Sequence, residues 1–478
     1  MKVLLVFPPA RGISKIPQGI GCIASFLRQK GHEVEVLDLT ALPLSDDALN
    51  KRIESFHHYG CIGISAIITS YNFVKNFSRV VKKKFPNMPI VVGNAISISC
   101  PEILLKNSEV DVIVVDEGEL TMAELVENIM NRGKYANIKG IWYKDDNGSI
   151  HKTLYRERIT DLDSLPYPAW DLLNIPIYMK HTGQFIDRGL RTGWVSAVRG
   201  CPFSCRYCSR SFGRVVTSRS ANSIIDEILE FKRLFKSTHF QIVDDLFMSN
   251  PKLVGDFARL LMERRVGITW ECTGRVNVVD EELLRLSKES GCISVSYGIE
   301  SGSQKILNNM NKGVTVEQAK RAIEVTRKVG LKVGAPFMYG YIGEDSETIA
   351  DTVNFIIEMK IETTRLFFST PYPGTQLYEW ARENNRIKYD EDTYISLLGN
   401  NAEKFLVNLT DFTDEDLLKL KDKTELLLRK ALPLKVKFEK YVIKRGFSIK
   451  ARIMQLGFIG TLKKIVEKIV SLNKAYQR

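Results

Sequence analysis

The feature that most constrains the fold is a repeated alternation of short, fully apolar strand candidates with amphipathic helix candidates. In the first part of the chain, helices are expected at residues 20–31 and 72–86. The strand candidates lie at residues 2–9, 32–39, 61–67, 89–95 and 110–119. Strands that are apolar along their whole length and separated by helices are typical of a parallel sheet covered on both faces. We therefore predict an α/β domain over residues 1–145, closing near a hairpin turn at Asn147-Gly148.

A second alternation follows a connector that we place at residues 146–190, where two prolines in residues 161–173 disfavour a continuous helix. Its strand candidates lie at residues 194–200, 239–245, 268–275, 292–300, 332–340 and 364–375. Six parallel β/α units close partly or wholly into a barrel, and the loops after the strands then carry the chemistry. We predict this partial (β/α)₆ barrel over residues 191–395.

The remaining residues, 396–478, are predicted to be helical and basic. A helix is expected at residues 413–432, where Thr413 and Asp416 have capping-box spacing. Residues 433–478 carry twelve lysines and arginines against two glutamates, and therefore hold most of the net charge of +12. The basic character belongs to this tail and says little about what the body of the chain binds.

Composition indicates an intracellular globular protein. The chain has 478 residues, of which 44% are hydrophobic and 26% charged, and no apolar run is long enough to span a membrane. Five of the eight cysteines are scattered, which does not fit a secreted disulfide framework, and the apolar start lacks a signal-peptide cleavage site. We therefore expect a cytoplasmic location.

The other three cysteines form one compact motif. The segment "GCPFSCRYCSR" places Cys201, Cys205 and Cys208 in a C-x₃-C-x₂-C pattern directly after the strand candidate at 194–200. Structural zinc and ferredoxin-type clusters both take four protein ligands, and no fourth cysteine is near. Three thiolates would leave one iron of a [4Fe–4S] cluster open, as catalytic metal sites do. The alternative is three free thiols in a turn.

This motif, with Tyr207 before its last cysteine, resembles the signature of the radical S-adenosylmethionine (SAM) enzymes. The resemblance implies that Cys201, Cys205 and Cys208 bind three irons and that SAM chelates the fourth. An electron from the cluster then cleaves SAM into methionine and a 5′-deoxyadenosyl radical, which removes a hydrogen atom from the substrate. It also implies a reducing partner such as flavodoxin or ferredoxin.

Later strand ends resemble the SAM-binding motifs of the same family. In "IVDDLF", Asp244 and Asp245 would hold the methionine end of SAM, or one of them caps the next helix. In "TGR", Arg275 suits a carboxylate, with a surface salt bridge as the alternative. In "SYGIESGS", Ser296 and Glu300 are expected at the cofactor, Glu300 on the ribose hydroxyls, unless Glu300 is a helix N-terminal acid.

The first domain resembles the cobalamin-binding, Rossmann-like domain fused ahead of many radical SAM enzymes. The matching segments are "FPPARG", "GISAIITSY", "VVGNA" and "VDEGELTMAEL". A flat ligand would lie over the carboxyl edge of the sheet, near Pro9, Gly93 and Gly118. The D-x-H-x-x-G motif is absent, so cobalamin would be bound without a histidine below cobalt. The alternative is a domain that only supports the barrel.

Together the two resemblances imply methylation of an unactivated carbon or phosphorus centre of a small-molecule or lipid substrate. A cobalamin-dependent cyclisation or rearrangement without methyl transfer is the enzymatic alternative. An electron carrier or iron sensor is the non-enzymatic one.

The tail segment "IMQLGFIGTLKKIVEKIVSL" has the pattern of a basic amphipathic helix. Such a helix either makes a peripheral membrane contact or packs on the barrel. No nucleic-acid recognition motif is present, so no nucleic-acid partner is expected.

Overall fold

The computed structural model describes residues 1–10, 16–181, 190–244, 246–362, 366–398 and 405–431. Within them the first domain is built on a seven-stranded sheet in the order β2-β1-β3-β4-β5-β6-β7, in which the first five strands are parallel. The strands are β1 (Lys2–Phe7), β2 (Glu33–Asp38), β3 (Cys61–Ser65), β4 (Ile90–Gly93), β5 (Val112–Val114), β6 (Ile141–Lys144) and β7 (Ile150–Lys152). The predicted parallel α/β architecture is confirmed. The antiparallel hairpin β6–β7 extends the sheet beyond residue 145.

Both faces of this sheet are covered because consecutive side chains of the strands point to opposite faces and are apolar on both. Val3 and Leu5 of β1 belong to one hydrophobic core, and Leu4 and Val6 belong to another on the opposite face. The helices over the two faces are α1 (Gln18–Gln29), α2 (Asp46–Ile53), α3 (Tyr71–Lys84), α4 (Ile96–Ser99), α5 (Pro101–Asn107) and α6 (Gly118–Met130). Parallel strands buried on both sides are the arrangement that the unbroken apolar runs predicted.

The connector is mostly irregular up to the short helix α7 (Ile175–His181), as the two prolines in residues 161–173 predicted. It is attached to the first domain by the Ala169 amide, which donates to the Gly21 carbonyl at 2.9 Å. The buried Tyr178 hydroxyl donates to the Asp38 carboxylate at the end of β2, at 2.9 Å. These contacts fix the path along which the chain leaves one sheet and enters the next.

The second domain has a five-stranded parallel sheet in the order β14-β13-β12-β11-β8. Its strands are β8 (Thr192–Val195), β11 (His239–Ile242), β12 (Thr269–Gly274), β13 (Cys292–Tyr297) and β14 (Lys332–Gly334). A further parallel pair, β15 (Met338–Tyr339) and β16 (Phe367–Phe368), continues the wall through a bridge between Glu300 and Phe337. The predicted partial barrel is confirmed.

Three strand predictions in the barrel were too long. In the described part of residues 364–375 the strand is only β16. The segment 194–200 is broken into β8 and β9 (Val198–Arg199), and β9 pairs with β10 (Thr217–Ser218) outside the main sheet. The segment 332–340 is broken between β14 and β15 at Pro336, which has no amide hydrogen to donate to a neighbouring strand. After each of the two breaks, the chain pairs with a strand outside the five-stranded sheet, β9 with β10 and β15 with β16.

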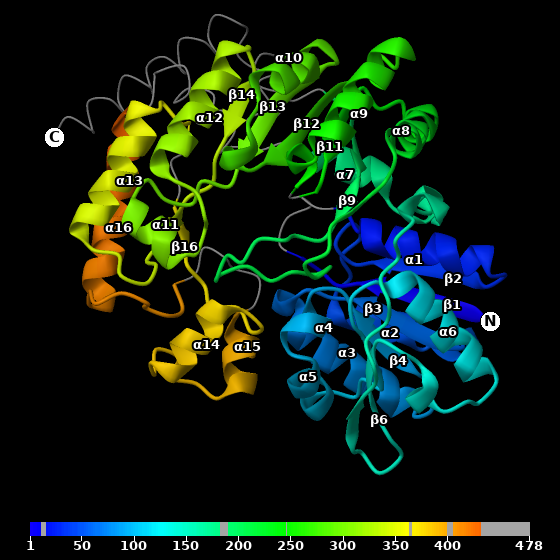
Figure 1. Ribbon diagram of the computed structural model, residues 1–478. Coiled ribbons are helices and arrows are strands. Elements are labelled where there is room, and N and C mark those ends of the chain that lie inside the picture. The colour runs from blue at the N-terminus through cyan, green and yellow to red at the C-terminus, as the bar shows by residue number, and fades with distance from the viewer. Residues whose placement is uncertain (11–15, 182–189, 245, 363–365, 399–404, 432–478) are drawn as a thin grey trace, which may run out of the picture.

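Helices cover the outer face of the barrel sheet (Figure 1). They are α8 (Ala221–Phe235), α9 (Pro251–Glu263), α10 (Glu281–Glu289), α11 (Gln304–Asn309), α12 (Val316–Lys328) and α13 (Ser346–Glu358). Phe240 of β11 packs on Phe231 of α8, and Trp270 of β12 packs on Phe257 of α9, with ring centroids 5.7 and 5.4 Å apart. Strand residues that alternate with these, such as Gln241 and Glu271, therefore point toward the inner face.

The last described helices are α14 (Gln376–Glu383), α15 (Glu391–Leu398) and α16 (Asp414–Ala431). The expected capping contact at α16 is present, because the Thr413 hydroxyl oxygen accepts from the Asp416 amide at 3.1 Å. Among the described residues, none of the helices is long and apolar enough to cross a membrane. The amphipathic tail predicted after residue 432 lies outside the described residues.

Helix α15 also joins the barrel side of the molecule to the first domain, where the two lie next to each other in Figure 1. Its Asp392 accepts from Lys75 at 2.7 Å and from the Tyr71 hydroxyl at 2.5 Å, and both partners belong to α3. The first domain is thus held by the connector on one side and by α15 on the other.

Phe231 lies at the centre of the aromatic packing between α8 and the sheet, against Trp170, Trp194 and Phe240. The substitution Phe231→Ala should lower the free energy of unfolding by about 3–5 kcal/mol, because it leaves a cavity that these rings cannot fill. Urea unfolding followed by circular dichroism measures this. Leu234→Ala on the same helix, where Leu234 is 43% exposed, is the control and should cost much less. Equal losses would contradict the packing described.

Candidate active site

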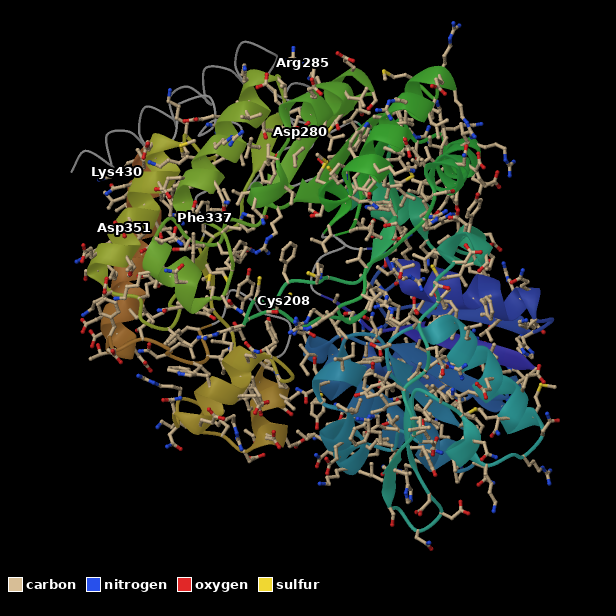
Figure 2. The ribbon with its side chains drawn as sticks, in the orientation of Figure 1. Cys208, Asp280, Arg285, Phe337, Asp351 and Lys430 are labelled. Atoms are coloured by element: carbon tan, nitrogen blue, oxygen red, sulfur yellow. The ribbon has the colours of Figure 1, made fainter. Side chains whose placement is uncertain are left out.

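The three motif cysteines lie on one loop, residues 200–216, which leaves the barrel at β9 and returns at β10. Figure 2 shows Cys208 on this loop, between the barrel and the first domain. Cys201 and Cys205 are partly buried, and Cys208 is exposed. We call this segment the cysteine loop. Its position at the carboxyl end of β8 is where parallel β/α folds carry their chemistry.

The cysteine loop is fixed by backbone contacts with the barrel. The Arg206 amide donates to the Met310 carbonyl after α11, and the Arg206 carbonyl accepts from the Leu377 amide of α14, both at 2.9 Å. The Asn311 side chain donates to the Ser204 carbonyl at 3.0 Å. These bonds attach the part of the loop between Cys201 and Cys208 to the segment after α11 and to α14.

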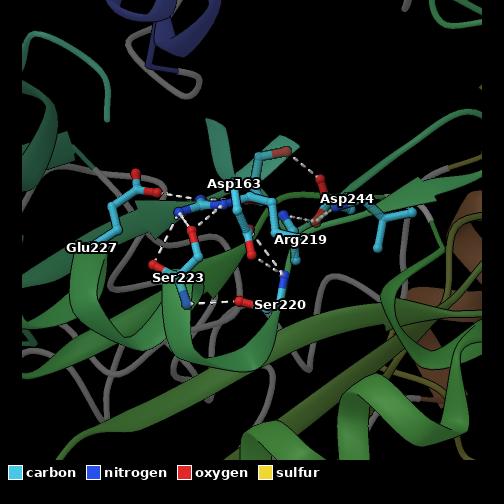
Figure 3. Close-up of polar contacts among 9 residues, drawn as sticks. Asp163, Arg219, Ser220, Ser223, Glu227 and Asp244 are labelled. Atoms are coloured by element: carbon cyan, nitrogen blue, oxygen red, sulfur yellow. Dashed lines mark hydrogen bonds and ion pairs between the residues drawn. The ribbon is translucent and has the colours of Figure 1, made fainter. Parts of the chain in front are cut away.

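Asp244 sets the point at which the chain turns out of the barrel wall. Its carboxylate accepts from the Ser196 hydroxyl at 2.5 Å, from the Ala197 amide and from the Val198 amide at 3.0 Å (Figure 3). The side chain is buried, and the cap of α9 is Asn250, so the helix-cap alternative for Asp244 was wrong. Asp245 lies outside the described residues. Contact of Asp244 with SAM stays a prediction.

The same segment is held from a second side by Arg219 (Figure 3). Its guanidinium donates to the Ser196 carbonyl at 2.9 Å and to the buried carboxylate of Glu227 on α8. Burial raises the pKa of Glu227, and the charge of Arg219 opposes that rise. Two charged side chains, Asp244 and Arg219, therefore fix the break between β8 and β9, because each of them bonds Ser196.

Arg275 lies against the cysteine loop. Its Nη1 is 3.8 Å from Cys205 Sγ, and its guanidinium lies 3.7 Å from the centre of the Phe203 ring. It is 7% exposed, which excludes the surface salt bridge considered as an alternative. Its Nε is buried and has no hydrogen-bond partner among the described residues. A buried guanidinium therefore lies beside the Cys205 sulfur and over the Phe203 ring.

Glu300, Lys312 and Tyr207 form a buried polar group beside the same loop. Lys312 Nζ lies 3.1 Å from the Glu300 carboxylate and 2.8 Å from the Tyr207 hydroxyl. Burial and then the charge of Glu300 raise the pKa of Tyr207. Glu300 precedes the start of α11 and is paired with Lys312, so it is not a helix N-terminal acid. Lys312 was missed from the sequence, where a lysine before glycine resembles a solvent-exposed turn.

Ser296 lies on β13 where the strands approach closely, since a Cβ on Gly334 would stand 2.9 Å from its hydroxyl oxygen. The predicted contact of Ser296 with the cofactor stays a prediction. In the first domain, Pro9 follows β1 and Gly93 is the last residue of β4, so both lie at the carboxyl edge of the sheet. A Cβ on Gly118 would instead meet Ile23 of α1 at 3.0 Å, so Gly118 permits helix packing.

The cysteine loop offers three thiols, which is the kind of donor that iron–sulfur clusters take. Together with the arginine beside Cys205, the three thiols on one loop fit a [4Fe–4S] cluster.

The carboxyl edge of the first sheet suits a flat, largely apolar ligand. Leu42, Leu44 and Ile67 follow β2 and β3 there and are 52%, 41% and 44% exposed. A Cβ on Gly93 would have no neighbour nearer than 3.7 Å, which leaves room at this edge. His57 and His58 lie before β3, at the opposite edge, so neither is placed to bind cobalt there.

Family comparisons agree with this arrangement. The radical SAM superfamily model matches residues 195–356, and the B12 binding domain model matches residues 15–126. The chain is 30% identical to an "uncharacterized methyltransferase" of Pyrococcus horikoshii over 473 residues, covering 95% of this chain and 98% of that protein. It is 27% identical to the anaerobic magnesium-protoporphyrin IX monomethyl ester cyclase of Rubrivivax gelatinosus, covering 76% of this chain and 66% of that one.

A solved structure has the same fold. It is the radical SAM methyltransferase TsrM of Kitasatospora setae with cobalamin and a [4Fe–4S] cluster bound, at a TM-score of 0.67 and 18% identity, covering 81% of this chain and 75% of that chain. The chain belongs to the cobalamin-dependent members of the radical SAM superfamily. It is therefore an enzyme, and its cofactors are a [4Fe–4S] cluster, SAM and cobalamin.

The Lys312–Glu300 contact gives a stability prediction. Lys312→Met should lower the free energy of unfolding by up to about 3 kcal/mol, because it leaves the Glu300 carboxylate, whose side chain is 13% exposed, without a counter-charge. The double substitution Lys312→Met/Glu300→Gln should recover most of that loss. Urea unfolding of both variants measures the difference. A double variant no more stable than Lys312→Met would contradict the pairing.

Proposed function

We propose that the enzyme transfers a methyl group from SAM to an unactivated carbon or phosphorus centre, with Cys201, Cys205 and Cys208 as the cluster ligands. The observation that carries the proposal is the position of the cysteine loop. It begins directly after Arg199 of β9, and Arg199 bonds Glu119 at the start of α6, which follows β5 at the carboxyl edge of the cobalamin-binding domain. A substrate held there would reach both cofactors.

When bound, the cluster supplies the electron that cleaves SAM, and cobalamin carries the methyl group. The chain's own part is to hold and orient. Arg275 keeps a positive charge beside Cys205, and Lys312 fixes the Tyr207 ring within the loop. Asp244 holds the turn from which the loop departs. A reducing partner such as flavodoxin or ferredoxin would deliver the electron.

The cyclase alternative is favoured by the likeness to cyclases such as the Rubrivivax gelatinosus enzyme, which is named for ring closure rather than methyl transfer. Methyl transfer is supported by the relative that matches nearly the whole chain and by the methyltransferase that shares the fold. The two differ in one measurable step, the fate of the SAM methyl group.

Label transfer separates the two reactions without knowledge of the substrate. Reconstituted enzyme is incubated anaerobically with methyl-labelled SAM, reduced cobalamin and dithionite. We expect label to co-elute with the cobalamin fraction. Production of 5′-deoxyadenosine without label in that fraction would contradict methyl transfer and favour cyclisation or rearrangement.

The cysteine assignment is tested by substitution. Cys201→Ala, Cys205→Ala and Cys208→Ala should each abolish the iron–sulfur absorption of the reconstituted protein and reduce 5′-deoxyadenosine formation to the rate without enzyme, because each thiolate binds one iron. Cys100→Ala, buried in the first domain, is the matched control and should retain the cluster. Cluster absorption that survives any of the three substitutions would refute the assignment.

A further inference from the structure

One arginine of the barrel is held by two carboxylates of the cobalamin-binding domain. Arg199 Nη1 lies 2.9 Å from Glu117 Oε1, and Arg199 Nη2 lies 2.5 Å from Glu119 Oε1. The glutamate side chains are 6% exposed and the arginine 13%. We call these three residues the Arg199 clamp. Charge-assisted bonds of this fork-like kind fix geometry as well as add energy.

The clamp joins the two segments that stand nearest the two cofactors. Arg199 ends β9, and only Gly200 separates it from Cys201. Glu117 and Glu119 begin α6 directly after β5, at the edge of the first sheet that a flat ligand would cover. A displacement of either segment would therefore be passed to the other through one guanidinium.

Further contacts fix the clamp itself. The Ile159 amide of the connector donates to Glu117 Oε2 at 2.7 Å, and Arg158 Nε lies 3.8 Å from the same oxygen. Arg158 also donates to the Val215 carbonyl on the returning arm of the cysteine loop, at 3.1 Å. Glu117 is therefore in contact with both ends of the cysteine loop. Arg199, just before the loop, bonds Glu117 directly, and Arg158 links Glu117 to Val215 near the end of the loop.

Gly200 shows how closely the two arms of the loop approach. It has φ +91°, and a Cβ there would stand 1.9 Å from the Val215 carbonyl oxygen. Any larger residue would push the arms apart. The loop thus begins at a rigid neck, and the clamp holds that neck.

Removal of one partner would leave buried charge uncompensated. Glu117 and Glu119 are both buried, and Arg199 bonds both carboxylates. Burial raises the pKa of the neighbouring Cys22 thiol to about 12, so that thiol stays neutral. Two arginines face two glutamates, and the group is balanced only while the domains are in contact.

We propose that the Arg199 clamp positions the cysteine loop against the cobalamin edge and so couples occupancy of the two cofactor sites. The inference rests on the proposed cluster ligands. If the clamp transmits position, cobalamin binds more tightly to protein that holds the cluster than to protein that lacks it. By linkage, the same factor applies to the cluster in the presence of cobalamin.

The test is a thermodynamic cycle with hydroxocobalamin as the probe. Its Kd is measured by visible absorbance titration on full-length protein with the reconstituted cluster and on Cys201→Ala/Cys205→Ala/Cys208→Ala protein without it. For the natural sequence we expect the cluster to tighten binding by about 5-fold or more, within the usual range of coupling between sites. Glu119→Gln and Arg199→Lys should reduce that ratio to less than about twofold.

The control is Asp392→Asn, which removes another contact between the first domain and the barrel side, at α15, away from the cysteine loop. It should keep the natural ratio. Circular dichroism melting checks that every variant is folded. Should Glu119→Gln fail to fold, Arg199→Lys still tests the clamp, because it keeps the positive charge and removes the forked contact.

Three results would overturn the inference: a ratio near one for the natural sequence, a natural ratio in both clamp variants, or an equal loss of coupling in Asp392→Asn. A cluster that persists in the triple cysteine variant would instead refute the ligand assignment, so the two failures are distinguishable.

Discussion

The arrangement of the molecule depends on one buried carboxylate, that of Asp244. Its bonds to Ser196, Ala197 and Val198 end the first barrel strand early and turn the chain outward. Without that turn, residues 198–201 would continue in the barrel wall, and the cysteine loop would not lie beside the first domain. A carboxylate that accepts several bonds in a buried place defines such a turn more sharply than backbone preference can. The rest of the site, including Arg275 and the Arg199 clamp, is arranged around the loop that begins there.

Much of the fold could be predicted because both sheets are parallel and buried. Unbroken apolar runs such as Leu4–Val6 are compatible with few structures besides a buried parallel strand. The helices expected at residues 20–31 and 72–86 are present as α1 and α3, whereas α2 was not predicted. The strand break after Val195 could not be predicted, since it depends on the carboxylate of Asp244, which bonds Ser196 from 48 residues later in the chain. The break at Pro336 has a local cause that the sequence does contain, because proline has no amide hydrogen to donate to a neighbouring strand. Sequence pattern reports local preference, whereas the first of these breaks is set by a tertiary contact.

The residues of the candidate site were predicted less completely than the strands and helices. The three cysteines stand together in the sequence, and their spacing, with its resemblance to the radical SAM signature, indicated a cluster with an open iron. Arg275 and Glu300 were expected to hold SAM, and the structure places them on Cys205 and Lys312. Lys312 and Arg199 were not singled out, because a buried charge is recognised only by the partner it meets in the fold. The acids that hold Arg199, Glu117 and Glu119, were expected at the end of a strand over residues 110–119, and the structure places them at the start of α6 instead.

The family, the fold and the cysteine loop lead to one central claim: the polypeptide supplies three ligands to a four-iron cluster and leaves the fourth iron for SAM. Mössbauer spectroscopy of protein reconstituted with ⁵⁷Fe, recorded with and without SAM, tests it most directly. The account predicts that one iron in four changes its isomer shift and quadrupole splitting when SAM is added, while three do not. Four equivalent irons that do not respond to SAM would contradict it.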